Sequence, residues 1–284
     1  MAGRRVAIVT GASSGIGLAT ALALARRRYA VLLAARRTDR LTEAAGRCEQ
    51  AGGVARAVTT DVTDRRQVEA LVSAAAEEFG RVDVMVNNAG VGLFARVHET
   101  TDADMRAIFE TNFFSVFNGC KAVAPIMIRQ GSGHIFNVSS VIGKRGTPFH
   151  GAYCATKFAV CGLTDSLRVE LAVHKVHVTS VCPAMTATEF FDHSPRARRP
   201  RSSFGSFTSL TPAAVVGRKI AATVGKNVPE LVFTPGGKFL TLIAALWPRA
   251  ADAMMRLYHD DLAKRLREAD EAEDRGDEAA TPGG

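Results

Sequence analysis

The sequence predicts an α/β fold: a doubly wound parallel sheet of seven strands, followed by a C-terminal helical extension. Two observations lead to this fold class. Short runs of Val, Ile, Leu and Ala alternate with longer helical stretches, and most of the runs are nearly unbroken, as in parallel strands covered on both faces. Alternation of this kind implies right-handed crossovers, which place helices on both faces of one sheet.

Each strand is expected to be followed by a helix along most of the chain. The expected strands lie near residues 5–10, 30–35, 54–59, 82–87, 133–139, 176–181 and 230–234. The expected helices lie near residues 15–28, 39–51, 64–79, 102–129, 152–173 and 212–225. Asp64 with Gln67 approximates a capping box, and Thr211 with Pro212 predicts an N-cap followed by proline at the first helical position.

A glycine turn joins the first strand to the first helix. It reads T-G-A-S-S-G-I-G over residues 10–17 and follows the apolar run V-A-I-V directly. A strand, a glycine turn and a helix in this order aim backbone N–H groups and the positive end of the helix at a diphosphate. The dinucleotide-binding residues expected in this turn are Gly11, Ser13, Ser14, Gly15, Ile16 and Gly17.

Tyr153 and Lys157 are the residues that point most directly to chemistry. They lie four positions apart in the run G-A-Y-C-A-T-K, so a helix would place both side chains on one face, a turn apart. A nearby ammonium group stabilises a phenolate and lowers the pKa of the tyrosine. A tyrosine tuned in this way can exchange protons near neutral pH.

Several distant segments are expected to meet at one edge of the sheet. The glycine turn, the segment 88–90, Ser140 and Pro183 each follow the end of an expected strand. In open α/β sheets the ligand crevice lies outside the carboxyl ends of the strands. The sequence therefore predicts a single site built from these segments.

In these positions the chain resembles the short-chain dehydrogenase/reductase family, in its standard branch. The matching residues follow the order of the family over about residues 4 to 235: Thr10, Gly11, Gly15, Ile16, Gly17, Asp61, Val62, Asn87, Asn88, Ala89, Gly90, Asn112, Ser139, Ser140, Tyr153, Lys157, Pro183 and Thr188. Ala184 departs from the family pattern, which usually has glycine after the proline, and this bears on the loop over the nicotinamide. Cys154 replaces a residue that is usually serine or alanine.

The resemblance implies a Rossmann fold, hydride transfer between a nicotinamide and a carbonyl carbon, and a role for each matched residue. Tyr153 exchanges the proton of the substrate oxygen, Ser140 holds that oxygen, and Lys157 lowers the tyrosine pKa and binds the nicotinamide ribose. Asn112 supports a water chain that returns protons through Lys157. The further cofactor-binding residues implied are Asp61, Val62, Asn88, Ala89, Gly90, Pro183 and Thr188.

The end of the second strand predicts which cofactor is bound. NAD enzymes usually carry an Asp or Glu there for the ribose 2′-hydroxyl, whereas an Arg accommodates the 2′-phosphate of NADP. Here Ala35 occupies the acid position, and Arg36 and Arg37 follow it. The planar fork and permanent charge of arginine suit a phosphate, so we expect NADP(H). Asp39 is expected to be a helix N-cap, and Arg40 to lie exposed at the helix start.

Composition agrees with a single nucleotide-binding domain that carries an appendage. The 284 residues are 47% hydrophobic, and five cysteines form no C-x-x-C pair, which predicts a reducing, cytoplasmic setting without a metal site. The net charge of +8 includes a tail, residues 268–284, with seven acids against one arginine. We expect a dehydrogenase domain over 1–235, a helical extension over 236–267 and a disordered acidic tail. The basic residues are dispersed and accompany no nucleic-acid-reading motif, so we expect no nucleic-acid partner.

The substrate is expected to be contacted by residues 186–210 and by the extension. Phe190, Phe191, Phe204 and Phe207 either line an apolar pocket or pack within the loop, and the arginine-rich segment 196–201 is interpreted as a solvated lid. The apolar run Phe239–Trp247 is too short to span a bilayer. It is an interfacial membrane helix, part of a substrate mouth, or a subunit contact.

Three functions are compatible with these patterns to different degrees. An NADPH-linked oxidoreductase is favoured, since every catalytic position is filled. A non-catalytic, NADP(H)-binding regulatory protein would usually lack the tyrosine or the lysine, and a nucleotide-sugar epimerase of the extended branch would need another glycine spacing and a larger C-terminal domain. The resemblance further implies a homo-oligomer, a dimer or tetramer, and leans towards lipophilic carbonyl or alcohol substrates such as steroids and retinoids.

Overall fold

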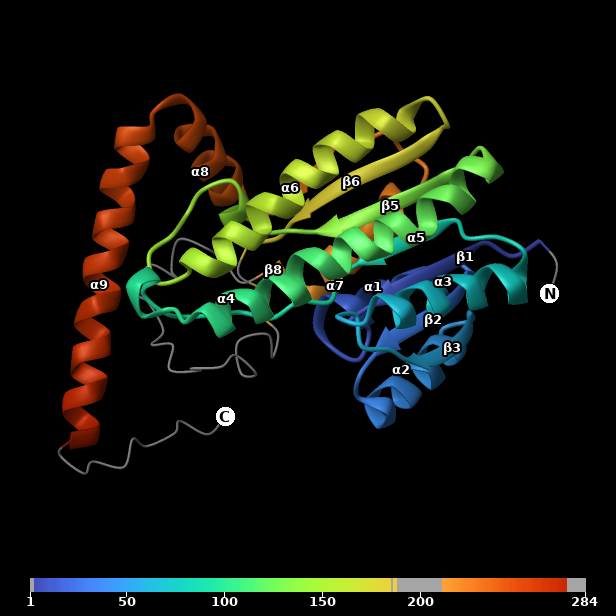
Figure 1. The fold of residues 1–284 in the computed structure, drawn as a ribbon, viewed down its shortest axis with the longest axis horizontal. Coiled ribbons are helices and arrows are strands. Elements are labelled where there is room, and N and C mark those ends of the chain that lie inside the picture. Colours follow the sequence, from blue (N-terminus) through green and yellow to red (C-terminus); the bar gives the residue numbers. More distant parts are fainter. Residues whose placement is uncertain (1–2, 185, 188–210, 275–284) are drawn as a thin grey trace.

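The computed structural model contains a seven-stranded sheet in which every neighbouring pair is parallel (Figure 1). It describes the chain apart from residues 1–2, 185, 188–210 and 275–284. The strand order is β3-β2-β1-β4-β5-β6-β9, as expected for a doubly wound fold. The strands are β1 (Val6–Thr10), β2 (Ala30–Ala35), β3 (Val54–Thr59), β4 (Val84–Asn87), β5 (Gly133–Val138), β6 (Val176–Cys182) and β9 (Glu230–Val232).

Helices cover both faces of this sheet, and each face has its own apolar core. Side chains alternate along a strand, so that Val9 packs with Leu24 and Ile220 in the core of one face, whereas Ile8 belongs to the core of the other face. The predicted fold class is thereby confirmed. The helices are α1 (Gly15–Ala25), α2 (Thr38–Gln50), α3 (Arg65–Phe79), α4 (Asp102–Phe109), α5 (Ser115–Gln130), α6 (Gly151–Ala172), α7 (Ala213–Thr223), α8 (Pro235–Leu246) and α9 (Pro248–Asp274).

The order of the strands determines where a ligand can bind. β1 leads to β2 on one side and β4 continues the sheet on the other, so the connections diverge between β1 and β4. Chain segments leave the carboxyl ends of these two strands in opposite directions and open a crevice between them. The glycine turn follows β1 and the Asn88 segment follows β4, so both lie at this crevice.

The predicted helix over residues 102–129 is interrupted by one turn of π-helix. This turn, η2 (Glu110–Phe114), separates α4 from α5. The wider turn contains Asn112, whose side-chain amide is fully buried and bonded to the main chain of another segment. π-Helical turns inside α-helices are frequent at functional sites.

The helix starts differ from the predictions in three places. Asp64 caps α3 by accepting from the Arg66 N–H (2.9 Å), but Gln67 accepts from the Asp61 N–H instead of closing a capping box. α7 begins at Ala213, so Pro212 and not Thr211 is the N-cap. α2 begins at Thr38, which places Asp39 in the first helical turn.

Two further strands and the C-terminal helices lie outside the main sheet. β7 (Thr186–Ala187) pairs with β8 (Thr211–Pro212) at the two ends of the substrate-loop region, whose predicted phenylalanines and arginines lie outside the described residues. α8 and α9 form the predicted extension, and α9 stands along one edge of the molecule (Figure 1). α9 continues past the predicted boundary at residue 267 to Asp274, into the segment expected to be disordered. The last ten residues of that segment lie outside the described chain.

Candidate active site

All three glycines of the turn are required, because Gly11 and Gly15 have positive φ and Gly17 packs closely against its neighbours. Gly11 has φ +64°, a backbone conformation that favours glycine. A Cβ on Gly17 would lie 2.2 Å from the Gly11 carbonyl oxygen and 2.7 Å from the Asn88 amide nitrogen. The Ser14 side chain makes no capping bond to α1. The start of α1 therefore keeps N–H groups for an anion, which fits a dinucleotide diphosphate.

The segment after β4 is attached to the glycine turn by main-chain and side-chain hydrogen bonds. The Thr10 hydroxyl accepts from the N–H groups of Asn88 (3.0 Å) and Ala89 (3.1 Å) and donates to the Val86 carbonyl. The Asn88 amide donates to the Thr10 carbonyl at 2.9 Å. Asn88, Ala89 and Gly90 are half-buried at the crevice, so the structure brings these predicted residues beside the turn.

The arginines after β2 reach across to the same turn. Arg37 donates through Nη2 to the hydroxyls of Ser13 (3.2 Å) and Ser14 (3.1 Å), whereas Arg36 is exposed. Asp61 accepts from the Thr63 N–H and hydroxyl, and these bonds, aided by the charge of Arg36, lower the pKa of the Asp61 carboxyl. Cationic and hydroxyl groups are thus gathered at one point, where a phosphate would be bound.

Tyr153 and Lys157 both lie on the buried face of α6. The Lys157 ammonium lies 5.6 Å from the centre of the Tyr153 ring and donates to the Val138 carbonyl at 2.9 Å. Burial lowers the pKa of Lys157 to about 8. Burial also raises the pKa of the Tyr153 phenol above its ordinary value, although a hydrogen bond with Ser140 opposes this change. The pKa of the phenol is therefore raised by its removal from water, and the lowering expected from Lys157 is not found.

Ser140 joins α6 to the loop that follows β6. Its hydroxyl is hydrogen-bonded to Tyr153 and donates to the Pro183 carbonyl at 3.3 Å. The Val141 N–H donates to the same carbonyl at 3.1 Å. Pro183 and Ala184 are buried beside this bond, while Thr188 lies outside the described residues.

Asn112 holds the crevice together from the π-helical turn. Its carbonyl oxygen accepts from the Val91 N–H (2.8 Å) and its amide donates to the Val91 carbonyl (2.9 Å) and the Thr156 hydroxyl (3.2 Å). The two-way bond attaches the π-helical turn to the segment that follows Asn88 to Gly90, and the bond to Thr156 attaches the same turn to α6. The predicted catalytic residue is therefore also a connector between two site segments.

Two contributors were not recognised as site residues in the sequence. The Ser139 hydroxyl donates to the Lys157 carbonyl at 2.9 Å, which attaches α6 to the end of β5. The Thr156 hydroxyl accepts a hydrogen bond from the Asn112 side-chain amide. An apolar cluster also surrounds the tyrosine: Val91, Leu93, Ile108, Phe109, Ile142 and Ala152. The family resemblance includes Ser139 as a matched residue but gives it no role. The apolar cluster around Tyr153 has no signal in the sequence, because its members come from four separate segments.

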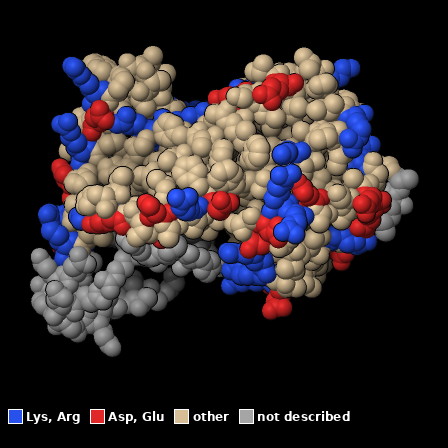
Figure 2. Space-filling view, in the orientation of Figure 1, with Lys and Arg blue, Asp and Glu red and all other residues tan. Residues whose placement is uncertain are grey.

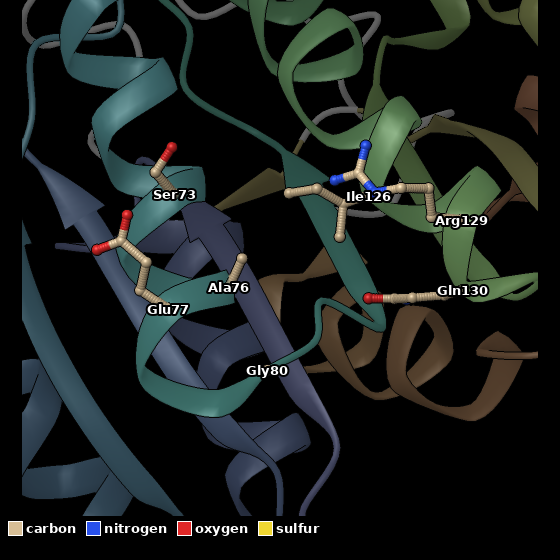
Figure 3. Close-up of a pocket in the computed structure, with 7 residues that line it drawn as sticks. All are labelled: Ser73, Ala76, Glu77, Gly80, Ile126, Arg129 and Gln130. Carbon is tan, nitrogen blue, oxygen red and sulfur yellow. The ribbon is translucent and has the colours of Figure 1, made fainter.

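The pocket in Figure 3 lies away from these residues. It is a shallow hollow of about 440 Å³ between α3 and α5, lined by Glu77, Arg129 and Gln130 among others. Gln130 is bonded to Val82, just before β4 begins, so the hollow is at the amino end of the sheet. In the described part of the chain no group of three or more His, Cys, Asp or Glu side chains could hold a metal ion. That the protein needs no metal stays a prediction.

Comparison with known proteins agrees with the geometry. The family model described as short chain dehydrogenase matches residues 5–199. A putative oxidoreductase, SadH, of Mycobacterium tuberculosis is 33% identical over 85% of this chain and 94% of its own length. Glycine betaine reductase ATRR of Emericella nidulans is 41% identical over 67% of this chain, which spans only 15% of that larger protein.

Solved structures with either nicotinamide cofactor resemble the chain. An alcohol dehydrogenase from the archaeon Thermococcus sibiricus, complexed with 5-hydroxy-NADP, is 30% identical with a TM-score of 0.72, over 81% of this chain and 96% of that one. An NAD⁺-bound xylitol dehydrogenase is 26% identical with a TM-score of 0.74, over 81% and 97%. The comparisons therefore support a nicotinamide cofactor without distinguishing the two forms.

Proposed function

The chain belongs to the short-chain dehydrogenase/reductase family, whose members oxidise alcohols or reduce carbonyls, and we propose that this member is NADP(H)-dependent and acts on a lipophilic carbonyl or secondary alcohol. The observation that carries the proposal is the hydrogen bond between Ser140 and Tyr153, with Lys157 beside it on α6. A hydroxyl pair next to an ammonium group can hold a carbonyl oxygen and exchange its proton.

Each of these side chains is assigned one task. When bound, the nicotinamide supplies or accepts the hydride. Tyr153 gives the substrate oxygen its proton or takes it away, and Ser140 donates a hydrogen bond to that oxygen and stabilises its developing charge. Lys157 binds the nicotinamide ribose and restores the proton of the tyrosine, with Asn112 fixing the segment beside it.

The apolar surroundings of Tyr153 support a lipophilic substrate. The cluster that includes Leu93, Ile142 and Phe109 packs around the phenol, and such side chains exclude water from a bound ketone. Testing apolar ketones and aldehydes for substrate-dependent NADPH oxidation identifies the class. A protein that oxidises NADPH with none of these substrates, but binds the cofactor, would contradict the proposed activity.

For the cofactor, we expect NADPH to bind more tightly than NADH by at least about tenfold, since one charge-assisted hydrogen bond contributes about 1.5–3 kcal/mol. Arg36 and Arg37 with the two serine hydroxyls are the groups that would hold the 2′-phosphate. Arg36→Ala and Arg37→Ala should each reduce the preference, and adding Ala35→Asp should reverse it. Fluorescence titration with both cofactors measures the dissociation constants.

Arg40→Ala is the matched control for the cofactor experiment. Arg40 lies in the first turn of α2, beyond the segment between β2 and α2 that carries Arg36 and Arg37, so its removal should leave the preference for NADPH unchanged. Equal dissociation constants for NADH and NADPH in the unmodified protein would refute the assignment. An effect of Arg40→Ala as large as that of Arg37→Ala would show that only general charge attraction is involved.

We also propose a homo-oligomer that is located in the cytoplasm. Exposed apolar side chains on the outer faces of α5 and α6, Phe117, Phe158 and Val169, support a contact with a second copy of the chain. All five cysteines are buried and unpaired, which supports a reducing compartment.

The extension is proposed to rest on an anionic membrane surface at the substrate entrance. Phe239, Leu242, Leu246 and Trp247 are 56–76% exposed on one side of α8. Between residues 231 and 251 the charged residues are Lys238 and Arg249, and both are basic. In Figure 2 the surface over α8, at the upper left, is mostly uncharged, with basic and acidic groups at its edge. No helix among the described residues is long and apolar enough to cross a bilayer.

The membrane contact predicts binding to vesicles that contain phosphatidylserine. We expect the protein to co-sediment with them, more weakly at high salt, and the double variant Leu246→Glu, Trp247→Glu to bind at least about tenfold less, because charges are costly at an apolar interface. Val173→Glu is the control, since Val173 is 80% exposed at the far end of α6. Equal sedimentation of all three proteins, or none by the unmodified protein, would contradict the contact.

A further inference from the structure

Phe149, four residues before Tyr153, has a backbone conformation that is unusual for its side chain. Its φ is +63°, in the left-handed region that bulky residues rarely enter. Arg28 and Lys175 share positive φ, but they follow the ends of α1 and α6, where such a residue is common. Phe149 instead precedes a helix. A strained residue persists only where its surroundings hold it in place.

The contacts that hold Phe149 come from two directions. Its carbonyl accepts from the Ala95 N–H at 2.8 Å, and its ring stacks with Phe94 at 5.4 Å. On α9, the His259 ring stacks on Phe149 at 5.3 Å and 10°, and the fully buried Leu262 packs with both phenylalanines. Two of the residues that hold Phe149, His259 and Leu262, therefore belong to the C-terminal extension.

The backbone conformation of Phe149 determines the direction in which the helix that carries Tyr153 begins. His150, the next residue, is the N-cap of α6, and its carbonyl accepts from the Cys154 N–H at 2.7 Å. A second tether, the ion pair of Arg145 with Asp252 at the start of α9, fixes the loop before Phe149. Figure 1 shows this loop and the turn before α4 both reaching α9. A change of φ at Phe149 would redirect the first turn of α6.

We propose that α9 is a positioning element for the active site: His259 and Leu262 hold Phe149 in its left-handed conformation and thereby fix the first turn of α6 and the place of the Tyr153 phenol. Neither α9 residue touches the reacting atoms. The expected effect on turnover rests on the proposed function. The expected effect on the first turn of α6 rests only on the contacts of Phe149. Leu93 lies next to Phe94, and Ile142 lies in the segment that leads to Phe149. Both pack against Tyr153, so the contacts with α9 also position the apolar cluster around the phenol.

The test uses paired variants of the full-length protein. Leu262→Ala and His259→Ala remove the two α9 contacts, and His259→Phe keeps a ring that can stack. Leu257→Ala is the matched control, because Leu257 is a leucine of the same helix that is 61% exposed. Hydrogen–deuterium exchange of residues 147–156 is measured for each variant, together with NADPH affinity, kcat and KM for an apolar ketone.

We expect exchange in residues 147–156 to accelerate at least about tenfold in Leu262→Ala and His259→Ala, with kcat reduced and NADPH affinity unchanged. His259→Phe should restore both exchange and kcat, and Leu257→Ala should resemble the unmodified protein. Unchanged exchange in folded Leu262→Ala and His259→Ala would overturn the positioning role whatever the activity. Accelerated exchange with normal kcat would also overturn it. No turnover by the unmodified protein, with exchange altered as expected, would refute the proposed function and leave α9 as a structural support only.

Discussion

Replacing Tyr153 by phenylalanine is expected to lower turnover at least about a hundredfold, because general acid–base groups typically contribute about 10² to 10⁴. The ring is buried and keeps its apolar contacts with Leu93 and Ile142, so its shape is unchanged. What is lost is the proton and the bond with Ser140. Turnover of an apolar ketone and the dissociation constant of NADPH are the two measurements. The dissociation constant should hardly change.

Tyr29→Phe is the matched control for this variant. Tyr29 is also buried but lies in the core at the start of β2, away from the crevice, so its hydroxyl has no part in the reaction.

Lys157→Met should differ from Tyr153→Phe by weakening NADPH binding as well as turnover, since Lys157 is assigned two tasks. Near-normal turnover by Tyr153→Phe would show that the catalytic assignment is mistaken.

Gly17→Ala is expected to remove NADPH binding almost completely and to destabilise the fold by about 3 kcal/mol or more. The added Cβ would lie 2.2 Å from the Gly11 carbonyl, a backbone atom that cannot rotate away. Either the turn or α1 must shift, and the N–H groups at the start of α1 would then no longer face a diphosphate. Denaturant unfolding and fluorescence titration with NADPH measure the two effects.

Gly46→Ala serves as the control for the glycine variant. Gly46 lies within α2, and nothing is found within 4 Å of a Cβ added there. Alanine has a higher helix propensity than glycine, so this variant should be more stable by about 0.5–1 kcal/mol and bind NADPH normally. A folded Gly17→Ala protein with normal NADPH affinity would exclude the glycine turn as the diphosphate site.

The sheet and the cofactor side of the crevice could be predicted because their signals are local. Apolar runs define the strands, and the glycine turn, the arginines after β2 and the Tyr153 to Lys157 spacing are each contained within a few residues. The parallel topology then brings their ends together without further information. For this reason the structure places the glycine turn, Asn88 and Ser140 around one crevice, as expected.

Contacts between distant segments could not be predicted in the same way. The π-helical turn at Asn112 reflects a bond with Val91, and the Phe149 conformation reflects stacking with His259, more than a hundred residues later. Neither pair leaves a period or a motif in the sequence. The sequence predicts a lowered pKa for Tyr153 because it shows the charged neighbour but not the burial of the phenol, and burial raises the pKa.

The position of α9 at the end of the chain has a consequence for protein synthesis. A ribosome releases the strands of the sheet up to β9 (Glu230–Val232) before it releases His259 and Leu262. The sheet and the glycine turn can therefore form before α9 is available to hold Phe149, which on the proposed role of α9 would be before Tyr153 is in place. Catalytic competence would be acquired last, so a chain cut or stopped short of α9 would be a nucleotide-binding protein with little enzymatic activity.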